Sequence, residues 1–127
     1  ENATSKKNIS ELQTILNDWL QNAKINESSR LATYVQKNMI TDLSRNFDRI
    51  NDKGVKQAPF YVLIGAQMPA ILVETAFISN KMECARLVDP NYQETISRGI
   101  LAGIRRYISE TRPTAYFGPA VPDGPGG

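Results

Sequence analysis

The stretch from which we infer the fold reads Met68-Pro-Ala-Ile-Leu-Val-Glu-Thr-Ala-Phe-Ile-Ser-Asn80. Its four apolar residues at 70–73 have no alternating polar face, so they predict a strand buried on both sides. The run ends in one carboxylate, Glu74, and open α/β sheets bind their ligands at the carboxyl ends of such strands. From position alone, Glu74 would more often cap the following turn or pair with a lysine.

The neighbouring segments predict a second strand and four helices. Phe60–Ile64 reads as a strand, and residues 65–69 as the turn between the two strands. The helices are expected over 9–23, 26–47 and 81–88 and from Asp89-Pro90 onward, with caps at Asn8, Asn26, Ser79-Asn80 and Asp89. Apolar residues recur at helical spacing, and the expected buried faces are Ile9, Leu12, Ile15, Leu16, Trp19, Leu20 and Ala23; Leu31, Tyr34, Val35, Met39, Leu43 and Phe47; and Ile96, Ile100, Leu101, Ile104, Tyr107 and Ile108.

These elements predict an α/β fold, part of a mixed or parallel sheet flanked by helices, with a helical hairpin at the N-terminus. A strand buried on both faces needs neighbours on both edges, and Phe60–Ile64 is the single candidate in this chain. We therefore expect the remaining strands to come from residues upstream of Glu1 or from another chain. One domain should span 1–112, and the Pro/Gly-rich composition predicts a disordered tail over 113–127.

Composition narrows the classes of function. The 127 residues suffice for one small core, and a net charge of +2, from 15 basic and 13 acidic residues, gives no basic patch of the kind that binds nucleic acid. Cys84 is the sole cysteine and histidine is absent, so no internal disulfide and no histidine-built metal site is expected within the chain. No run is long enough for a transmembrane segment, and no secretory signal is present. We read the chain as a fragment or a processed product.

Several motifs together resemble the type 3 family of zinc-dependent N-acetylmuramoyl-L-alanine amidases. The most specific is the stretch 68–80. Others are Gly54-Val-Lys-Gln-Ala-Pro-Phe-Tyr-Val-Leu63, the pair formed by 83–87 and Asp89-Pro-Asn-Tyr-Gln93, and Gly99-Ile-Leu-Ala-Gly-Ile-Arg-Arg-Tyr107. Upstream, residues 15–20 and 26–32 resemble the division-associated members of Gram-negative type.

The resemblance implies a peptidoglycan hydrolase that cleaves the amide between N-acetylmuramic acid and L-alanine, with Glu74 as the catalytic carboxylate. Such enzymes bind Zn²⁺ through two histidines and a glutamate in their N-terminal half, and none of those motifs is here. The zinc ligands are therefore expected outside this chain, which should be inactive alone. The implied location is the periplasm or cell envelope, and the implied partners are peptidoglycan, the missing N-terminal half of the domain and a LytM-like activator.

Residues 1–50 would then be a helical regulatory region, with the helix 9–23 near the mouth of the active site. Glu11 or Glu27 could block the zinc from there, although each fits a position in a first helical turn better. Trp19 and Phe77 are expected in the core, and Cys84 as a small buried hydrophobic residue. The alternative is a non-catalytic interaction module whose helical hairpin, residues 9–47, binds a partner helix.

Overall fold

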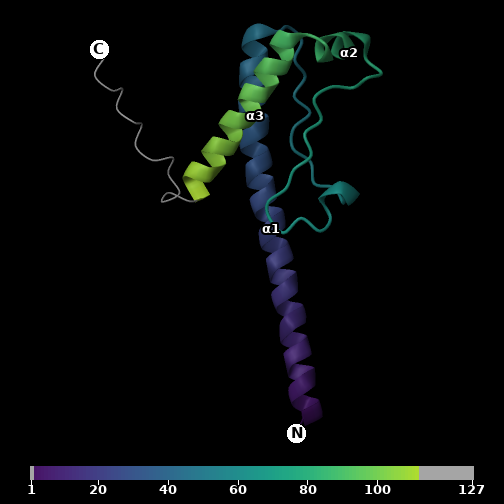
Figure 1. The fold of residues 1–127 in the computed structure, drawn as a ribbon, viewed down its shortest axis with the longest axis vertical. Coiled ribbons are helices and arrows are strands. Elements are labelled where there is room, and N and C mark those ends of the chain that lie inside the picture. Colours follow the sequence, from purple (N-terminus) through teal and green to yellow (C-terminus); the bar gives the residue numbers. More distant parts are fainter. Residues whose placement is uncertain (1, 112–127) are drawn as a thin grey trace, which may run out of the picture.

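The chain folds into one long helix with a shorter helix packed along its C-terminal half. A computed structural model describes residues 2–111, so the expected tail over 113–127 lies outside the described residues. The elements are α1 (Asn2–Asn46), the 3₁₀ turn η1 (Tyr61–Leu63), α2 (Lys81–Leu87) and α3 (Pro90–Thr111). In Figure 1, α3 runs beside α1 and diverges from it toward its own C-terminal end, while the N-terminal half of α1 stands alone.

The core lies where α3 crosses the C-terminal half of α1. Its buried side chains are Val35, Met39, Leu43, Tyr92 and Ile96, with Leu31, Phe47, Ile50, Ile71, Val73 and Ile100 packed around them. The predicted face of residues 31–47 is thereby confirmed. On α3 the buried face is rotated from the predicted one: Leu101 and Ile104 are exposed, and Gly99 and Gly103 are buried. These glycines let the backbone of α3 approach that of α1 at Met39 and Val35.

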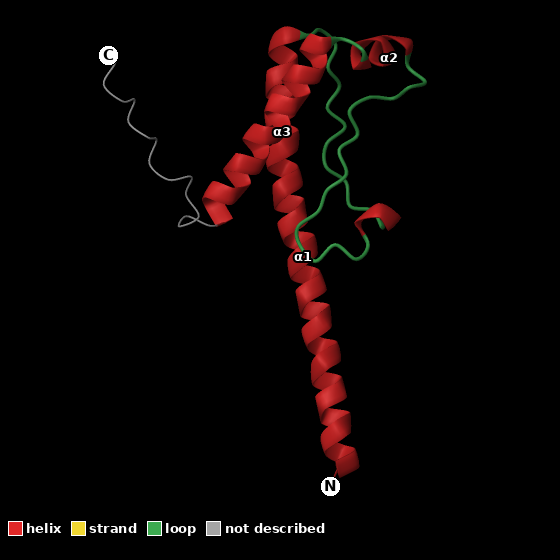
Figure 2. Cartoon of the chain, in the orientation of Figure 1, coloured by secondary structure: helices red, strands yellow, loops and turns green. Residues whose placement is uncertain are grey.

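The predicted α/β sheet is wrong. Within residues 2–111 the structure has no strand, and Figure 2 shows helices and loops alone. The expected strand Phe60–Ile64 is a 3₁₀ turn in which Leu63 N–H donates to Phe60 O and Ile64 N–H donates to Tyr61 O. The expected strand at 70–74 is extended loop.

The physical reason is that a strand requires a hydrogen-bonded neighbour, and two short strands alone are marginally stable at best. The backbone of these segments bonds to side chains of α1 instead. Ser28 Oγ accepts from the N–H of Ala70 at 3.0 Å, and Lys24 Nζ donates to the Leu63 carbonyl at 3.3 Å. The run 70–73 is also buried on one side rather than two, because Val73 packs against the core whereas Leu72 is 46% exposed.

The predicted helical hairpin is also wrong, because α1 continues without a break through residues 24–26. No glycine or proline interrupts Lys24-Ile25-Asn26, and an asparagine inside a helix costs at most about 0.7 kcal/mol. Starting a new helix would require a new nucleation step. Asn8 likewise lies inside α1 rather than at a cap.

The N-terminal half of α1 carries an apolar stripe that no other described element covers. We call this set, residues 9, 12, 15, 16, 19 and 20, the α1 stripe; its side chains are 52–75% exposed. The expectation that Trp19 lies in a core is therefore wrong, since it is 75% exposed. No helix among residues 2–111 is long and apolar enough to span a membrane.

The starts of α2 and α3 confirm their predicted caps. Asn80 Oδ1 accepts hydrogen bonds from the backbone N–H groups of Met82 and Glu83. Asp89 Oδ1 accepts from the N–H of Asn91 at 2.8 Å, and Pro90 occupies the first position of α3. Both helices therefore begin where local side-chain chemistry satisfies their free N–H groups.

Candidate active-site segment around Glu74

Glu74 lies on an extended loop beside the core, seven residues before α2 begins at Lys81. Its side chain is exposed, so the prediction of a carboxylate at a buried strand end is wrong on both points. Within the described part of the chain, the Glu74 carboxylate has neither a hydrogen bond nor an ion pair. The alternative role of Glu74, as a turn cap or a partner of a lysine, therefore finds no support among residues 2–111.

The loop that carries Glu74 is anchored on both sides of this residue. Ile71 and Val73 precede Glu74 and pack against the core, while the N–H of Ala70 donates to Ser28 of α1. On the other side, the hydroxyl of Tyr92 donates to the Thr75 carbonyl at 3.1 Å. The structure therefore exposes the carboxylate while fixing the backbone that carries it.

Residues 77–83 continue this anchoring into α2. The N–H of Phe77 donates to Glu83 Oε2 at 2.7 Å, and Asn80 caps the helix. Glu83 occupies the third helical position, and its carboxylate reaches back past the cap to Phe77. Phe77 itself is 48% exposed, with Lys53 Nζ at 5.9 Å from the ring centroid, so its expected role in the core is wrong. Cys84 is exposed as well, contrary to prediction.

Sequence reasoning missed Tyr92 and Glu83 as supports of the Glu74 loop. A usable signal was present, because the similarity to the amidases includes both segments in which they lie. The local patterns describe these residues as parts of helices and do not say which distant backbone groups they reach.

The two carboxylates considered as possible zinc blockers lie in different environments. Glu11 is exposed on the uncovered half of α1. Glu27 connects α1 to α3: Tyr107 Oη donates to it at 2.7 Å, and Arg30 pairs with it at 3.1 Å. The Tyr107 hydrogen bond is the largest cause of a lowered pKa at Glu27; desolvation opposes it, and the hydrogen bond and charge of Arg30 add to it. Glu27 thus has a structural role in helix packing.

A second carboxylate joins the same two helices near the end of α3. Tyr34 of α1 donates to Glu110, and Arg106 Nε also donates to Glu110 at 2.5 Å. The hydrogen bond from Tyr34 is the largest cause of a lowered pKa at Glu110. Together with Glu27, this carboxylate joins α3 to α1 by side-chain hydrogen bonds.

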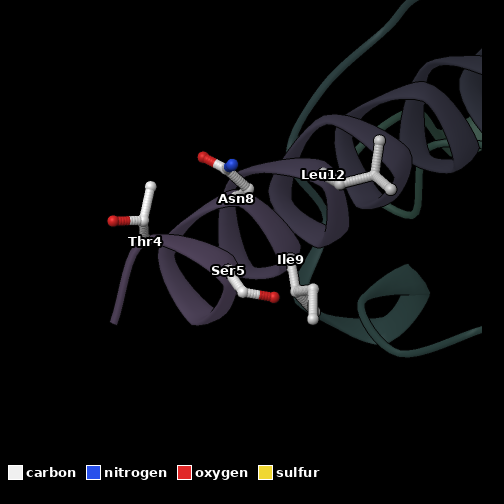
Figure 3. A pocket seen from close by; sticks show the side chains of 5 residues that line it. All are labelled: Thr4, Ser5, Asn8, Ile9 and Leu12. Carbon is white, nitrogen blue, oxygen red and sulfur yellow. The ribbon is translucent and has the colours of Figure 1, made fainter. Parts of the chain in front are cut away.

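The hollow shown in Figure 3 is a shallow surface on the first turns of α1. Its lining residues are Thr4, Ser5, Asn8, Ile9 and Leu12. All five belong to one helix, so no second element encloses a ligand. This hollow is therefore not a candidate site.

The sequence of these segments matches a known protein family. Residues 2–106 match N-acetylmuramoyl-L-alanine amidase, and the match includes the Glu74 loop and all the helices that anchor it, up to residue 106 of α3. The chain belongs to the N-acetylmuramoyl-L-alanine amidase family.

Individual amidase relatives agree with this membership. The chain is 39% identical over 71 residues to the N-acetylmuramoyl-L-alanine amidase AmiC of Escherichia coli O6:H1, a match that covers 56% of this chain and 17% of AmiC. It is 34% identical over 98 residues to AmiC of Neisseria meningitidis serogroup B, covering 77% of this chain and 22% of the relative. It is also 34% identical over 83 residues to the uncharacterized protein YqiI of Bacillus subtilis, a match that covers 65% of this chain and 38% of YqiI.

The chain therefore spans well under half the length of the curated relatives it matches. No solved structure matches it.

Amidases of this family are generally zinc-dependent, but the residues that the structure describes, 2–111, do not fit a zinc site. Residues 2–111 contain no group of three or more His, Cys, Asp or Glu side chains that could hold a metal ion. The whole sequence has no histidine, whereas catalytic zinc sites usually have three converging protein ligands.

Proposed function

We propose that this chain supplies the catalytic carboxylate, Glu74, of an enzyme that hydrolyses the amide between N-acetylmuramic acid and L-alanine in peptidoglycan. The observation that carries the proposal is the family match over residues 2–106, which includes Glu74. The structure supports this proposal because the Glu74 carboxylate is exposed and has no partner within residues 2–111. The loop that carries it is anchored on both sides.

A carboxylate in this position can act as a general base and then as a general acid. It takes the proton from the water molecule that attacks the amide carbonyl, and it passes that proton to the departing amine of L-alanine. Such a group needs access to substrate and a fixed backbone; the exposure of Glu74 and the anchoring of its loop support this role. Any Zn²⁺ would need ligands from outside this chain, since the residues described here do not fit one.

The proposal also specifies partners and place. Residues 1–112 would be the C-terminal part of one amidase domain, complemented by an N-terminal half that holds the zinc. The enzyme would act on peptidoglycan in the periplasm or cell envelope during cell division, as an autolysin under the control of a LytM-like activator. Within it, residues 1–50 would be the helical regulatory region, and the uncovered α1 stripe favours this assignment.

The same stripe favours a second candidate, a non-catalytic helical interaction module. Exposed apolar side chains that gather on one helix face are typical of surfaces that bind a partner. This candidate does not need a carboxylate at position 74, so the two functions differ in what a change at Glu74 does.

The test is Glu74→Gln in the enzyme that combines this chain with its zinc-binding half. This change keeps the shape of the side chain and removes the base, so the release of stem peptides should fall by a factor of about 10² to 10⁴. Glu94→Gln is the matched control, because Glu94 is an exposed carboxylate on α3 that pairs with Arg98. Near-normal hydrolysis by Glu74→Gln, with zinc content unchanged, would reject the assignment and leave the interaction module.

A further inference from the structure

The loop behind Glu74 is held by a side chain that no sequence pattern connected with catalysis. Tyr92 lies in the first turn of α3 and is 5% exposed. Its ring meets Phe47 edge-on, with centroids 5.2 Å apart and an interplanar angle of 82°. Its hydroxyl leaves this apolar contact and donates to the carbonyl of Thr75, the residue next to Glu74.

Few other bonds hold this part of the backbone. Between Ala70 and Phe77, the described residues supply three side-chain hydrogen bonds to backbone groups, from Ser28, Tyr92 and Glu83. The bonds to Ser28 and Glu83 lie at the two ends of this stretch, four and three residues from Glu74. Tyr92 therefore acts closest to the carboxylate, at a distance of one peptide unit.

Burial keeps the Tyr92 hydroxyl suited to this task. Desolvation is the largest cause of a raised pKa at Tyr92; the charge of Arg86 opposes it and that of Glu83 adds to it. The phenol consequently stays protonated and remains a donor at neutral and mildly alkaline pH. An acceptor such as the Thr75 carbonyl therefore keeps its partner throughout that range.

We propose that Tyr92 is a positioning residue for Glu74: its hydroxyl holds the Thr75 carbonyl and thereby the direction in which the carboxylate points. The inference rests on the proposed function, because it assigns Tyr92 a role only if Glu74 is the base. The ring and the hydroxyl have separable tasks. The ring packs in the core with Phe47, and the hydroxyl alone reaches the loop.

Tyr92→Phe separates these tasks, since it deletes the hydroxyl and keeps the ring. In the complete enzyme, we expect kcat to fall roughly 10- to 100-fold, the scale on which a small misplacement of a catalytic group acts. KM should stay within about twofold, because the change does not touch bound substrate. The thermal midpoint should stay close to that of the unchanged protein.

Tyr107→Phe is the matched control. It removes another α3 tyrosine hydroxyl, one that bonds Glu27 of α1 and does not touch the Glu74 loop. It should leave kcat unchanged. A fall in kcat of equal size for both variants would overturn the inference, because the effect would then follow helix packing.

Hydrogen exchange in the 127-residue chain gives a readout independent of activity. Amides of the peptide covering residues 72–79 should exchange faster in Tyr92→Phe and at the normal rate in Tyr107→Phe. Unchanged exchange in Tyr92→Phe would overturn the inference. So would full kcat in Tyr92→Phe while Glu74→Gln is inactive. Full activity of Glu74→Gln would instead reject the proposed function, whatever Tyr92→Phe does.

Discussion

The contact between α1 and α3 leads to a sharp prediction about Gly103. A Cβ atom added there would lie 2.4 Å from the Cα of Val35 and 2.6 Å from its backbone nitrogen. Ordinary contacts of a Cβ atom are 3.4–4 Å, so the helices would have to separate by about 1 Å to accept it. The obstacle is backbone, which cannot rotate away as a flexible side chain can.

The expected effect is the difference between two opposing contributions. Overpacking costs about 1–3 kcal/mol, while alanine is better than glycine inside a helix by up to about 1 kcal/mol. Gly103→Ala should therefore lower the free energy of unfolding by about 0.5–2 kcal/mol. At roughly 4–8 °C per kcal/mol for a small domain, the thermal midpoint should fall by several degrees.

Thermal unfolding followed by circular dichroism, together with hydrogen exchange in α3, measures this loss. Gly99→Ala should cost less, because its Cβ would lie 2.7 Å from Met39 Cα and 3.0 Å from the flexible Cγ. Ser97→Ala, at an exposed position of α3, controls for helix propensity and should not destabilise. A Gly103→Ala protein that melts at or above the normal midpoint would refute the close packing of the two helices.

Two further outcomes follow from the charges and from the α1 stripe. The pKa of Glu27 is lowered below its ordinary value of 4.5, mainly by the Tyr107 hydrogen bond, so its stabilising contribution is present above about pH 4.5 and is lost as the pH falls through the lowered value. The thermal midpoint should decline over that acidic range, and less steeply in Glu27→Gln; equal slopes would contradict the linkage. Leu16→Glu changes a residue that is 52% exposed, so the unfolding of the 127-residue chain should shift by no more than about 0.5 kcal/mol. If α1 restricts access to the active site, the same change in the complete enzyme should raise basal amidase activity. Loss of the fold without any gain in rate would instead show that the helix has only a structural role.

Part of the candidate site could be predicted from the sequence because it depends on neighbours along the chain. The caps at Asn80 and Asp89 are interactions across two or three residues, and both are present. The buried face at Val35, Met39 and Leu43 follows from helical periodicity, which one element expresses without reference to any other. Glu74 could be singled out because its flanking motif is contiguous in sequence.

The tertiary structure decided what depends on distant partners. The run 70–73 has strand-like composition, but a strand forms only where another backbone satisfies its hydrogen bonds. Here helix side chains bond the backbone instead, Ser28 at Ala70 and Tyr92 at Thr75, just after the run. The rotation of the buried face of α3 depends on Gly99 and Gly103 meeting Met39 and Val35. The amino-acid pattern thus determined where α2 and α3 begin, whereas only packing determined which backbone groups the helices hold, because those contacts join residues far apart in sequence.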